Sequence, residues 1–230
     1  MKADDIQKEI RSLADPKRAK TSAWFFKTGP GDYGEGDKFL GLTTPQMRVI
    51  SKKYKDLPLS EVQELIKSPY HEERSIAIQI LVLQYPKNSK AIYDFYLKNT
   101  TYINNWDLVD ISAPKIVGAF LLNHPAGIIS KLANSGNLWE RRIAIISTFA
   151  FIYEGRPNLT LKISKILLND KQDLIHKAVG WMLREVGKRC GEKYLTEFLD
   201  LYCLTMPRTM LRYAIERLPE KKRKYYLNLH

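Results

Sequence analysis

Five segments of this chain resemble one another and recur at a nearly constant interval. They begin at positions 75, 107, 142, 177 and 212, so the spacings are 32, 35, 35 and 35 residues. A steady period of this length is typical of a solenoid of helix pairs, in which each repeat packs on its neighbours. The alternative is a chance similarity among amphipathic helices. The segments read Ser75-Ile-Ala-Ile, Asp107-Leu-Val-Asp, Arg142-Ile-Ala-Ile, Lys177-Ala-Val-Gly and Arg212-Tyr-Ala-Ile.

Local signals favour helices over strands. Thr44-Pro45 offers an N-cap followed by proline at the first helical position, and the run from Ser60 to Gln63 fits a capping box. The third position of every repeat is small or β-branched, which lets neighbouring helices pack closely. We therefore predict an all-α solenoid, with residues 1–230 forming a single domain. The five third positions are Ala77, Val109, Ala144, Val179 and Ala214.

Composition narrows the class of protein. No apolar run approaches the roughly 20 residues that span a bilayer, and no signal peptide is recognisable behind the first residues. Cys190 and Cys203 are the only cysteines, and the four histidines (71, 124, 176 and 230) are scattered without metal-ligand spacing. We expect a cytoplasmic, reduced protein that needs no membrane, metal or cofactor.

The charge of the chain indicates a polyanionic partner. The net charge is +12 and the isoelectric point is near 9.5. An excess of this size favours nucleic acid. The last three repeats begin with Arg142, Lys177 and Arg212, which would form a basic ladder along the concave side of a solenoid and suit a duplex phosphate backbone. The alternative is a row of solvated charges on an outer face.

Asp110 breaks the repeat. The equivalent residue is isoleucine in three of the other four segments and Gly180 in the remaining one, which Trp181 follows directly. Trp106 precedes Asp110 by four residues, so the two share one helix face. A carboxylate in an apolar column is costly unless a cation compensates it. One acid with two indole walls would suit a cation through charge and cation–π attraction.

Each aromatic also has a purely structural interpretation. A single tryptophan in a helix is more often part of the core than of a site. Trp24, which lies next to two phenylalanines, is interpreted as core, and Trp139 as a packing residue at a helix start. Asp107 is interpreted as a helix-start or solvent residue.

The chain resembles the AlkD-type DNA alkylation repair enzymes over nearly its full length. The resemblance lies in the stretches 105–110, 123–125, 139–142 and 177–185, and in the N-terminal motifs 26–29, 34–37 and 39–42 with Pro45 and Arg48. It implies a right-handed α-solenoid of HEAT-like repeats with a concave basic face. The element Trp106-x-x-x-Asp110 combined with the later Gly180-Trp181 element carries most of its specificity.

The resemblance also implies roles for single residues. Asp110 matches the catalytic carboxylate, Trp106 and Trp181 match the aromatics that cradle the deoxyribose, and Arg142 matches a phosphate contact. Basic residues near these positions are weaker candidates for contacts with DNA, and they are Lys177, Arg184, Lys188 and Arg212.

The expected function is that of a monofunctional DNA glycosylase. It would excise 3-methyladenine and 7-methylguanine from double-stranded DNA as a monomer in base excision repair, without a Schiff-base lysine. An alkylated purine is cationic and leaves readily, so the enzyme has mainly to stabilise charge on the sugar. One alternative is a non-catalytic relative that binds damaged or branched DNA. Another is a helical scaffold that binds an acidic protein.

Overall fold

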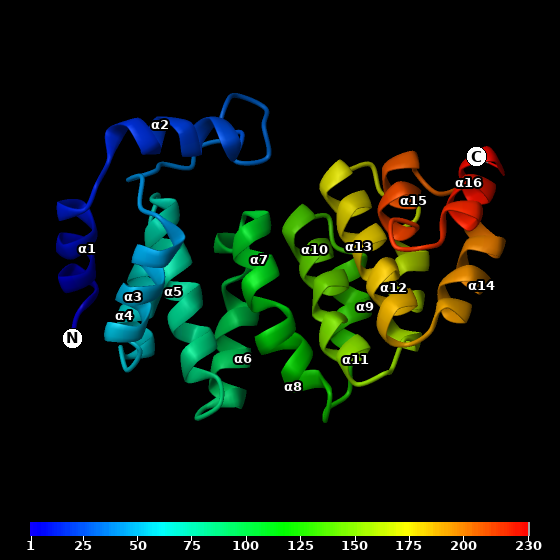
Figure 1. Ribbon diagram of the computed structural model, residues 1–230. Coiled ribbons are helices and arrows are strands. Elements are labelled where there is room, and N and C mark those ends of the chain that lie inside the picture. The colour runs from blue at the N-terminus through cyan, green and yellow to red at the C-terminus, as the bar shows by residue number, and fades with distance from the viewer. Residues whose placement is uncertain (230) are drawn as a thin grey trace. The chain divides into compact units, whose positions relative to one another are not determined.

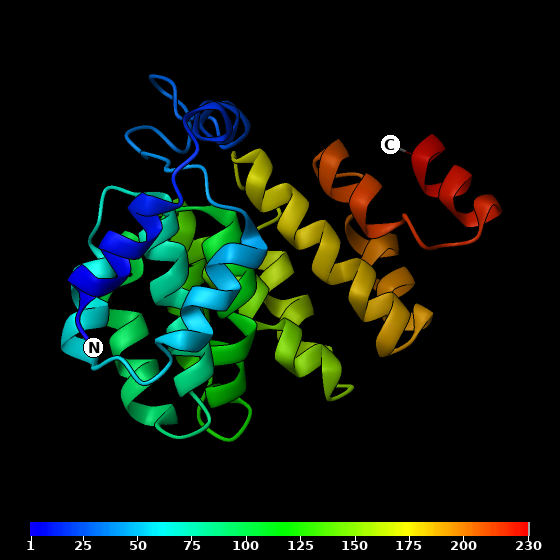
Figure 2. The ribbon, with the colours of Figure 1, turned by 60° about the vertical axis from the view of Figure 1, so that its left-hand side comes forward.

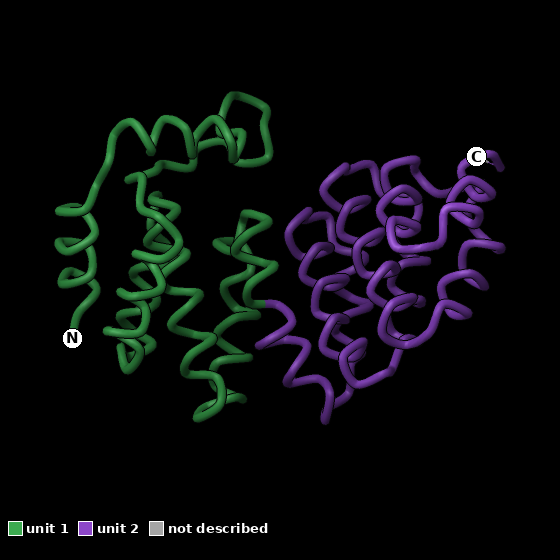
Figure 3. Tube along the Cα trace, viewed as in Figure 1, with its two compact units in different colours: residues 1–112 green, residues 113–230 purple. Residues whose placement is uncertain are grey.

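The computed structural model describes residues 1–229. These residues form helices joined by loops, with one isolated β-bridge between Lys38 and Tyr70 (Figures 1 and 2). The predicted all-α fold of helix pairs is therefore confirmed. The chain divides into two compact units, Met1–Ser112 and Ala113–His230 (Figure 3). The prediction of a single domain stays a prediction.

The first unit is organised around α5 (His71–Gln84), against which α3, α4, α6 and α7 all pack. Ten consecutive residues from the start of α5, apart from one glutamine near their end, are buried, so this helix is surrounded on every side. The other helices are α1 (Ala3–Ser12), α2 (Pro16–Phe25), α3 (Thr44–Lys53), α4 (Leu59–Ile66), α6 (Ser89–Lys98), η1 (Thr100–Tyr102) and α7 (Trp106–Ser112).

The second unit is organised around α13 (Asp173–Arg189), which packs against α10, α11, α12, α14 and α15. It begins with the π-helical turn η2 (Pro114–Gly118) and the short α8 (Ala119–Leu121). The remaining helices are α9 (Gly127–Ala133), α10 (Leu138–Ser147), α11 (Phe149–Tyr153), α12 (Asn158–Ile166), α14 (Glu192–Tyr202), α15 (Arg208–Ala214) and α16 (Glu220–Leu229).

The five repeated segments lie in one set of equivalent helices, α5, α7, α10, α13 and α15, and the last segment extends one residue beyond α15 to Ile215. Successive members pack side by side within each unit, α5 on α7 in the first, and α10 on α13 on α15 in the second. Each small or β-branched third position is fully buried, as expected where two helices approach closely. At the fourth position of the repeat, Ile78, Ile145 and Ile215 are also buried, whereas Asp110 is only half-buried.

Two predicted helix starts are shifted. The capping box lies at Thr43 and Gln46, where each side chain bonds the other's backbone N–H, and proline occupies the second position of α3. The predicted box at Ser60 is wrong, because α4 begins at Leu59 after Pro58 and has no side-chain cap. None of the described helices is both long and apolar enough to cross a membrane.

Candidate functional site

The start of α7 is fixed by Asn105, which is fully buried. Its side-chain oxygen accepts a hydrogen bond from the backbone N–H of Trp106 at 2.8 Å, and its backbone carbonyl accepts from Val109 N at 3.2 Å. These bonds satisfy donors that a helix N-terminus otherwise leaves open. Trp106 and Asp110 follow one turn apart on the same helix, as the spacing predicted.

The indole of Trp106 is packed by the end of α2. The Phe26 ring stacks on it with centroids 5.5 Å apart and planes at 22°, and Phe25 meets it edge-on at 6.1 Å. Phe26 in turn stacks on Phe39 at 5.2 Å. Aromatic pairs of this kind add to the energy of simple burial. The N-terminal segment therefore sets the position of Trp106, which remains half-buried.

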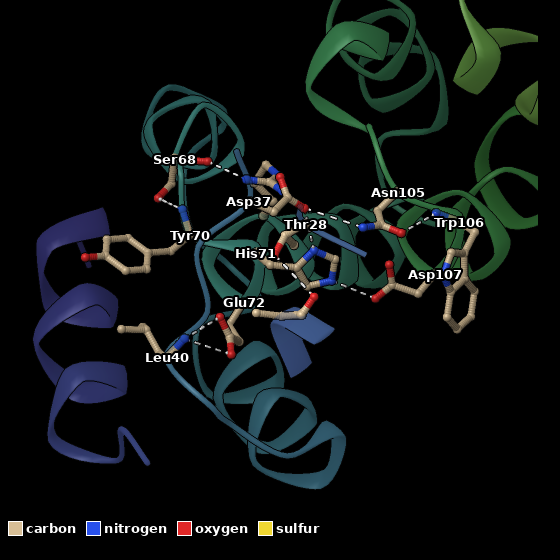
Figure 4. Close-up of polar contacts among 12 residues, drawn as sticks. Thr28, Asp37, Leu40, Ser68, Tyr70, His71, Glu72, Asn105, Trp106 and Asp107 are labelled. Atoms are coloured by element: carbon tan, nitrogen blue, oxygen red, sulfur yellow. Dashed lines mark hydrogen bonds and ion pairs between the residues drawn. The ribbon is translucent and has the colours of Figure 1, made fainter. Parts of the chain in front are cut away.

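A largely buried charge network lies next to the start of α7, where Trp106 is found (Figure 4). His71, at the first position of α5, contacts Asp107 through Nε2 at 2.8 Å and Asp37 through Nδ1 at 3.3 Å. Arg74 pairs with the other oxygen of Asp37 at 2.7 Å and donates to the Ser68 carbonyl. Asn105 donates to Asp37 at 3.4 Å, so the network joins the loop before α3 to α5 and to the start of α7.

The network controls the protonation of His71. Burial alone would lower the pKa of His71, but the carboxylates of Asp107 and Asp37 outweigh it and raise that pKa from 6.5 to about 9. Burial likewise opposes ionisation of Asp37, yet the hydrogen bond from His71 and the charge of Arg74 lower the pKa of Asp37 below its ordinary value. At neutral pH the network therefore holds a charged imidazolium between two carboxylates.

Asp110 lies close to the buried hydroxyl of Tyr96. That hydroxyl is 2.9 Å from Ser112 Oγ, one helix away on α7. Burial, together with the charge of Asp110, raises the pKa of Tyr96 above its ordinary value, so the phenol keeps its proton. Among the described residues 1–229, Asp110 is the one polar residue at the fourth position of the repeat. The other four residues at that position are buried, whereas Asp110 is half-buried.

Trp181 belongs to the second unit and is held differently. Its ring contacts Phe149 with centroids 5.7 Å apart, and it is half-buried on α13. The preceding Gly180 allows α15 to approach, because a Cβ there would lie 2.5 Å from both Met210 O and Tyr213 Cβ. The loss of isoleucine at position 180 is therefore explained by helix packing. That Trp181 faces Asp110 stays a prediction.

The three residues of the predicted basic ladder have different surroundings. Arg142 is 5% exposed and donates from Nη1 to the Leu174 carbonyl at 2.6 Å. Lys177 is half-buried and forms an ion pair with Asp173 at 2.7 Å, whereas Arg212 is exposed. They do not form three equivalent solvated charges. Their contact with DNA stays a prediction.

The other two basic candidates also differ. Arg184 forms an ion pair with Glu216 and contacts Glu185 at 3.4 Å, so its charge is largely compensated. Lys188, one turn further along α13, is exposed. The contact of either residue with DNA stays a prediction.

One interpretation made from the sequence is wrong, and another is confirmed in only one of its alternatives. Trp24 is 80% exposed rather than core, because α2 buries none of its residues and Phe26, just beyond its end, packs inward instead. Asp107 lies in the first turn of α7, which confirms the helix-start alternative, and it bonds His71 rather than serving only as a solvent-facing residue. Trp139 is buried at the start of α10, as predicted.

Sequence reasoning missed the charge network altogether. A signal was present in the run from His71 to Arg74, four consecutive ionisable residues that open a buried helix. Glu72 accepts backbone N–H bonds from Leu40 and Gly41, which ties down the loop that precedes α3. In the part of the chain that the structure describes, no group of His, Cys, Asp and Glu is arranged to hold a metal ion, and His230 lies outside that part.

Comparison with known families places the chain. The sequence model of the family named DNA alkylation repair enzyme matches residues 6–218 of the chain. The chain belongs to this family. Membership confirms the resemblance that the Trp106 and Asp110 motif indicated, and a role in the repair of alkylation damage follows from it.

Solved structures support the fold of this DNA alkylation repair family member. A predicted DNA alkylation repair enzyme from Enterococcus faecalis matches with a TM-score of 0.70 and 18% identity, covering 90% of this chain and 97% of that one. The crystal structure of smu.31 from Streptococcus mutans UA159 matches with a TM-score of 0.54 and 15% identity, covering 99% and 96%. No protein of curated function matches.

Proposed function

We propose that the protein is a monofunctional DNA glycosylase that removes cationic N3- and N7-alkylated purines from double-stranded DNA. The observation that carries the proposal is the pairing of Trp106 and Asp110 on one turn of α7, in a family whose members repair alkylation damage. The charge network and the Phe26 stack hold that turn in place, which is what a catalytic group requires.

The proposed reaction is hydrolysis of the N-glycosidic bond. The bond's electron pair leaves with the alkylated base, which is already cationic and needs no strong general acid. Positive charge develops on the deoxyribose, and the Asp110 carboxylate stabilises it electrostatically. The oxygen of a water molecule then bonds to the anomeric carbon, and its proton is lost to Asp110 or to solvent. Trp106 and Trp181 would add cation–π attraction for the same charge.

The surface of α2 supports nucleic acid as the partner. Trp24 is 80% exposed and Phe25 is 56% exposed, and exposed lysines lie close to them in sequence. Exposed aromatics among cations are typical of nucleic-acid surfaces, where rings stack on bases and lysines contact phosphates. The lysines are Lys17, Lys20 and Lys27, and no hydrogen bond or ion pair occupies their side chains within the described residues.

The test is release of 7-methylguanine from methylated duplex DNA. We expect the wild type to release it and Asp110→Asn to be at least about 100-fold slower, the effect of removing one preorganised electrostatic group. Asp94→Asn is the matched control, since Asp94 is a partly exposed acid of the same unit that pairs with Lys90. It should keep the wild-type rate.

Three outcomes would count against the proposal. Equal rates for Asp110→Asn and wild type would remove Asp110 from the mechanism. Duplex binding by the wild type without any base release would favour a non-catalytic DNA-binding protein. Efficient release of uracil, a neutral base and a poor leaving group, would contradict the argument from charge.

A further inference from the structure

A pocket of about 410 Å³ in the second unit is lined by three arginines, and the catalytic proposal makes no use of it. Its walls come from α15, from the turn that follows it and from α16. Arg208 and Arg212 lie one helical turn apart on α15, and Arg223 faces them from α16. The other lining residues are Tyr213, Ile215, Glu216 and Leu227.

The pocket carries a net positive charge. Glu216 is the one acid among its lining residues, and it is already paired with Arg184. Because that pair neutralises the acid, the charges of the three arginines are left uncompensated. Three like charges around one small space repel one another, so an anion entering the pocket relieves that repulsion.

Two of the guanidinium groups are available to a ligand. Arg208 donates from Nη1 to the Leu227 carbonyl at 3.0 Å, which fixes its position while leaving its charge intact. The side chains of Arg212 and Arg223 are exposed and make no hydrogen bond or ion pair with residues 1–229. A planar guanidinium presents paired N–H donors that match two oxygens of a phosphate.

The uncharged residues that line the pocket suit the sugar and the base, which accompany the phosphate in a nucleotide. Tyr213 is 37% exposed and offers an aromatic face and a hydroxyl, and Ile215 and Leu227 are apolar. We propose that this pocket binds the phosphate group of a nucleotide, supplied by a phosphodiester of the DNA strand. The phosphate chemistry stands on the pocket itself, whereas DNA as its source rests on the proposed function.

The experiment measures binding and not excision. Affinity for a short, unmodified DNA duplex is measured by fluorescence anisotropy as a function of salt, and affinities for deoxyadenosine monophosphate and inorganic phosphate by calorimetry. We expect Arg212→Gln and Arg223→Gln each to weaken duplex binding about tenfold, the loss of a charged hydrogen bond, and to reduce the salt slope by about 1. Neither side chain makes a hydrogen bond or ion pair within residues 1–229 that the substitution would remove, and circular dichroism checks that both variants fold.

The matched control is Arg217→Gln, which removes the same charge from an exposed arginine that does not line the pocket. It should change duplex affinity by less than about twofold. Equal losses of duplex affinity for Arg212→Gln and Arg217→Gln would overturn the proposal that the pocket binds phosphate. If Arg212→Gln and Arg223→Gln lose affinity for the mononucleotide and inorganic phosphate but not for the duplex, a DNA strand is not the source of the bound phosphate. If Arg212→Gln and Arg223→Gln weaken duplex binding while the wild type releases no 7-methylguanine, the glycosylase proposal is refuted and the phosphate-binding pocket stands.

Discussion

The two tryptophans singled out by the sequence are held in place by different forces. Trp106 lies on an aromatic stack beside a buried network of charges that links Asp37, His71, Arg74 and Asp107. Trp181 follows a glycine at a close approach of two helices and contacts one phenylalanine ring. The position of Trp106 therefore depends on ionisation as well as on ring packing, and that of Trp181 on packing alone.

This difference decides what each region tolerates. Buried ion pairs stabilise a fold only while every charge keeps its partner, so the surroundings of Trp106 are sensitive to pH and to loss of one member. The close approach to Gly180 is made by a backbone carbonyl and a Cβ, neither of which carries a charge, so it is sensitive to added volume instead. Three changes should separate the two kinds of support.

The largest effect is expected from Asp37→Ala. Asp37 is the shared partner of Arg74 and His71, both almost fully buried, and its loss leaves Arg74 without a counter-charge. Breaking a buried pair in this way costs about 3–5 kcal/mol of unfolding free energy. Urea unfolding measures it. Asp32→Ala, at an exposed position of the same loop, is the control and should leave the unfolding free energy nearly unchanged. A cost for Asp37→Ala below about 1 kcal/mol would show that the network does not stabilise the fold.

A second change concerns pH. The pKa of His71 is about 9 in the folded protein against 6.5 ordinarily, so protonated His71 stabilises the fold fully below pH 6.5. That contribution, on the order of 3 kcal/mol, is lost as the pH rises through 9. The stability difference between wild type and His71→Gln should therefore shrink between pH 6.5 and pH 9.5 or so. A difference that stays constant over this range would mean that His71 is neutral in the folded protein.

The smallest effect is expected from Gly180→Ala. The added methyl would meet the Met210 carbonyl and the Tyr213 Cβ at 2.5 Å, so α13 and α15 must move apart. Overpacking of this kind costs about 1–3 kcal/mol, and the cost should not vary with pH between 6.5 and 9. Gly127→Ala, where an added methyl meets nothing within 4 Å, is the control for thermal unfolding. Equal melting temperatures for Gly180→Ala and wild type would show that the contact can relax.

The repeat was readable from the sequence because it is a matter of local pattern. A 35-residue period and buried third positions such as Ala144 follow from the need of stacked helices to pack closely. Asp110 could be identified for the same reason, since an acid in an apolar column stands out against its neighbours. Trp24 could not be assigned, because three adjacent aromatics give no sign of which one points inward.

The partners of His71 lie beyond any such pattern. Asp37 precedes it by 34 residues and Asp107 follows it by 36, and no spacing rule relates them. Likewise, Gly180 suggested a site beside Trp181, whereas its absent side chain makes room for α15. In both cases the deciding contact is made by a different helix or loop of the same unit.

The sequence by itself therefore determined the helical repeat, the position of Asp110 within it and the family. These depend on periodicity and on short spacings along one helix, which the chain carries locally. Only the tertiary structure decided which charges are compensated. It paired His71 with two distant acids, buried Arg142 and placed Arg208, Arg212 and Arg223 around one pocket. Compensation requires groups to lie within a few ångströms of one another, and folding alone brings distant residues that close.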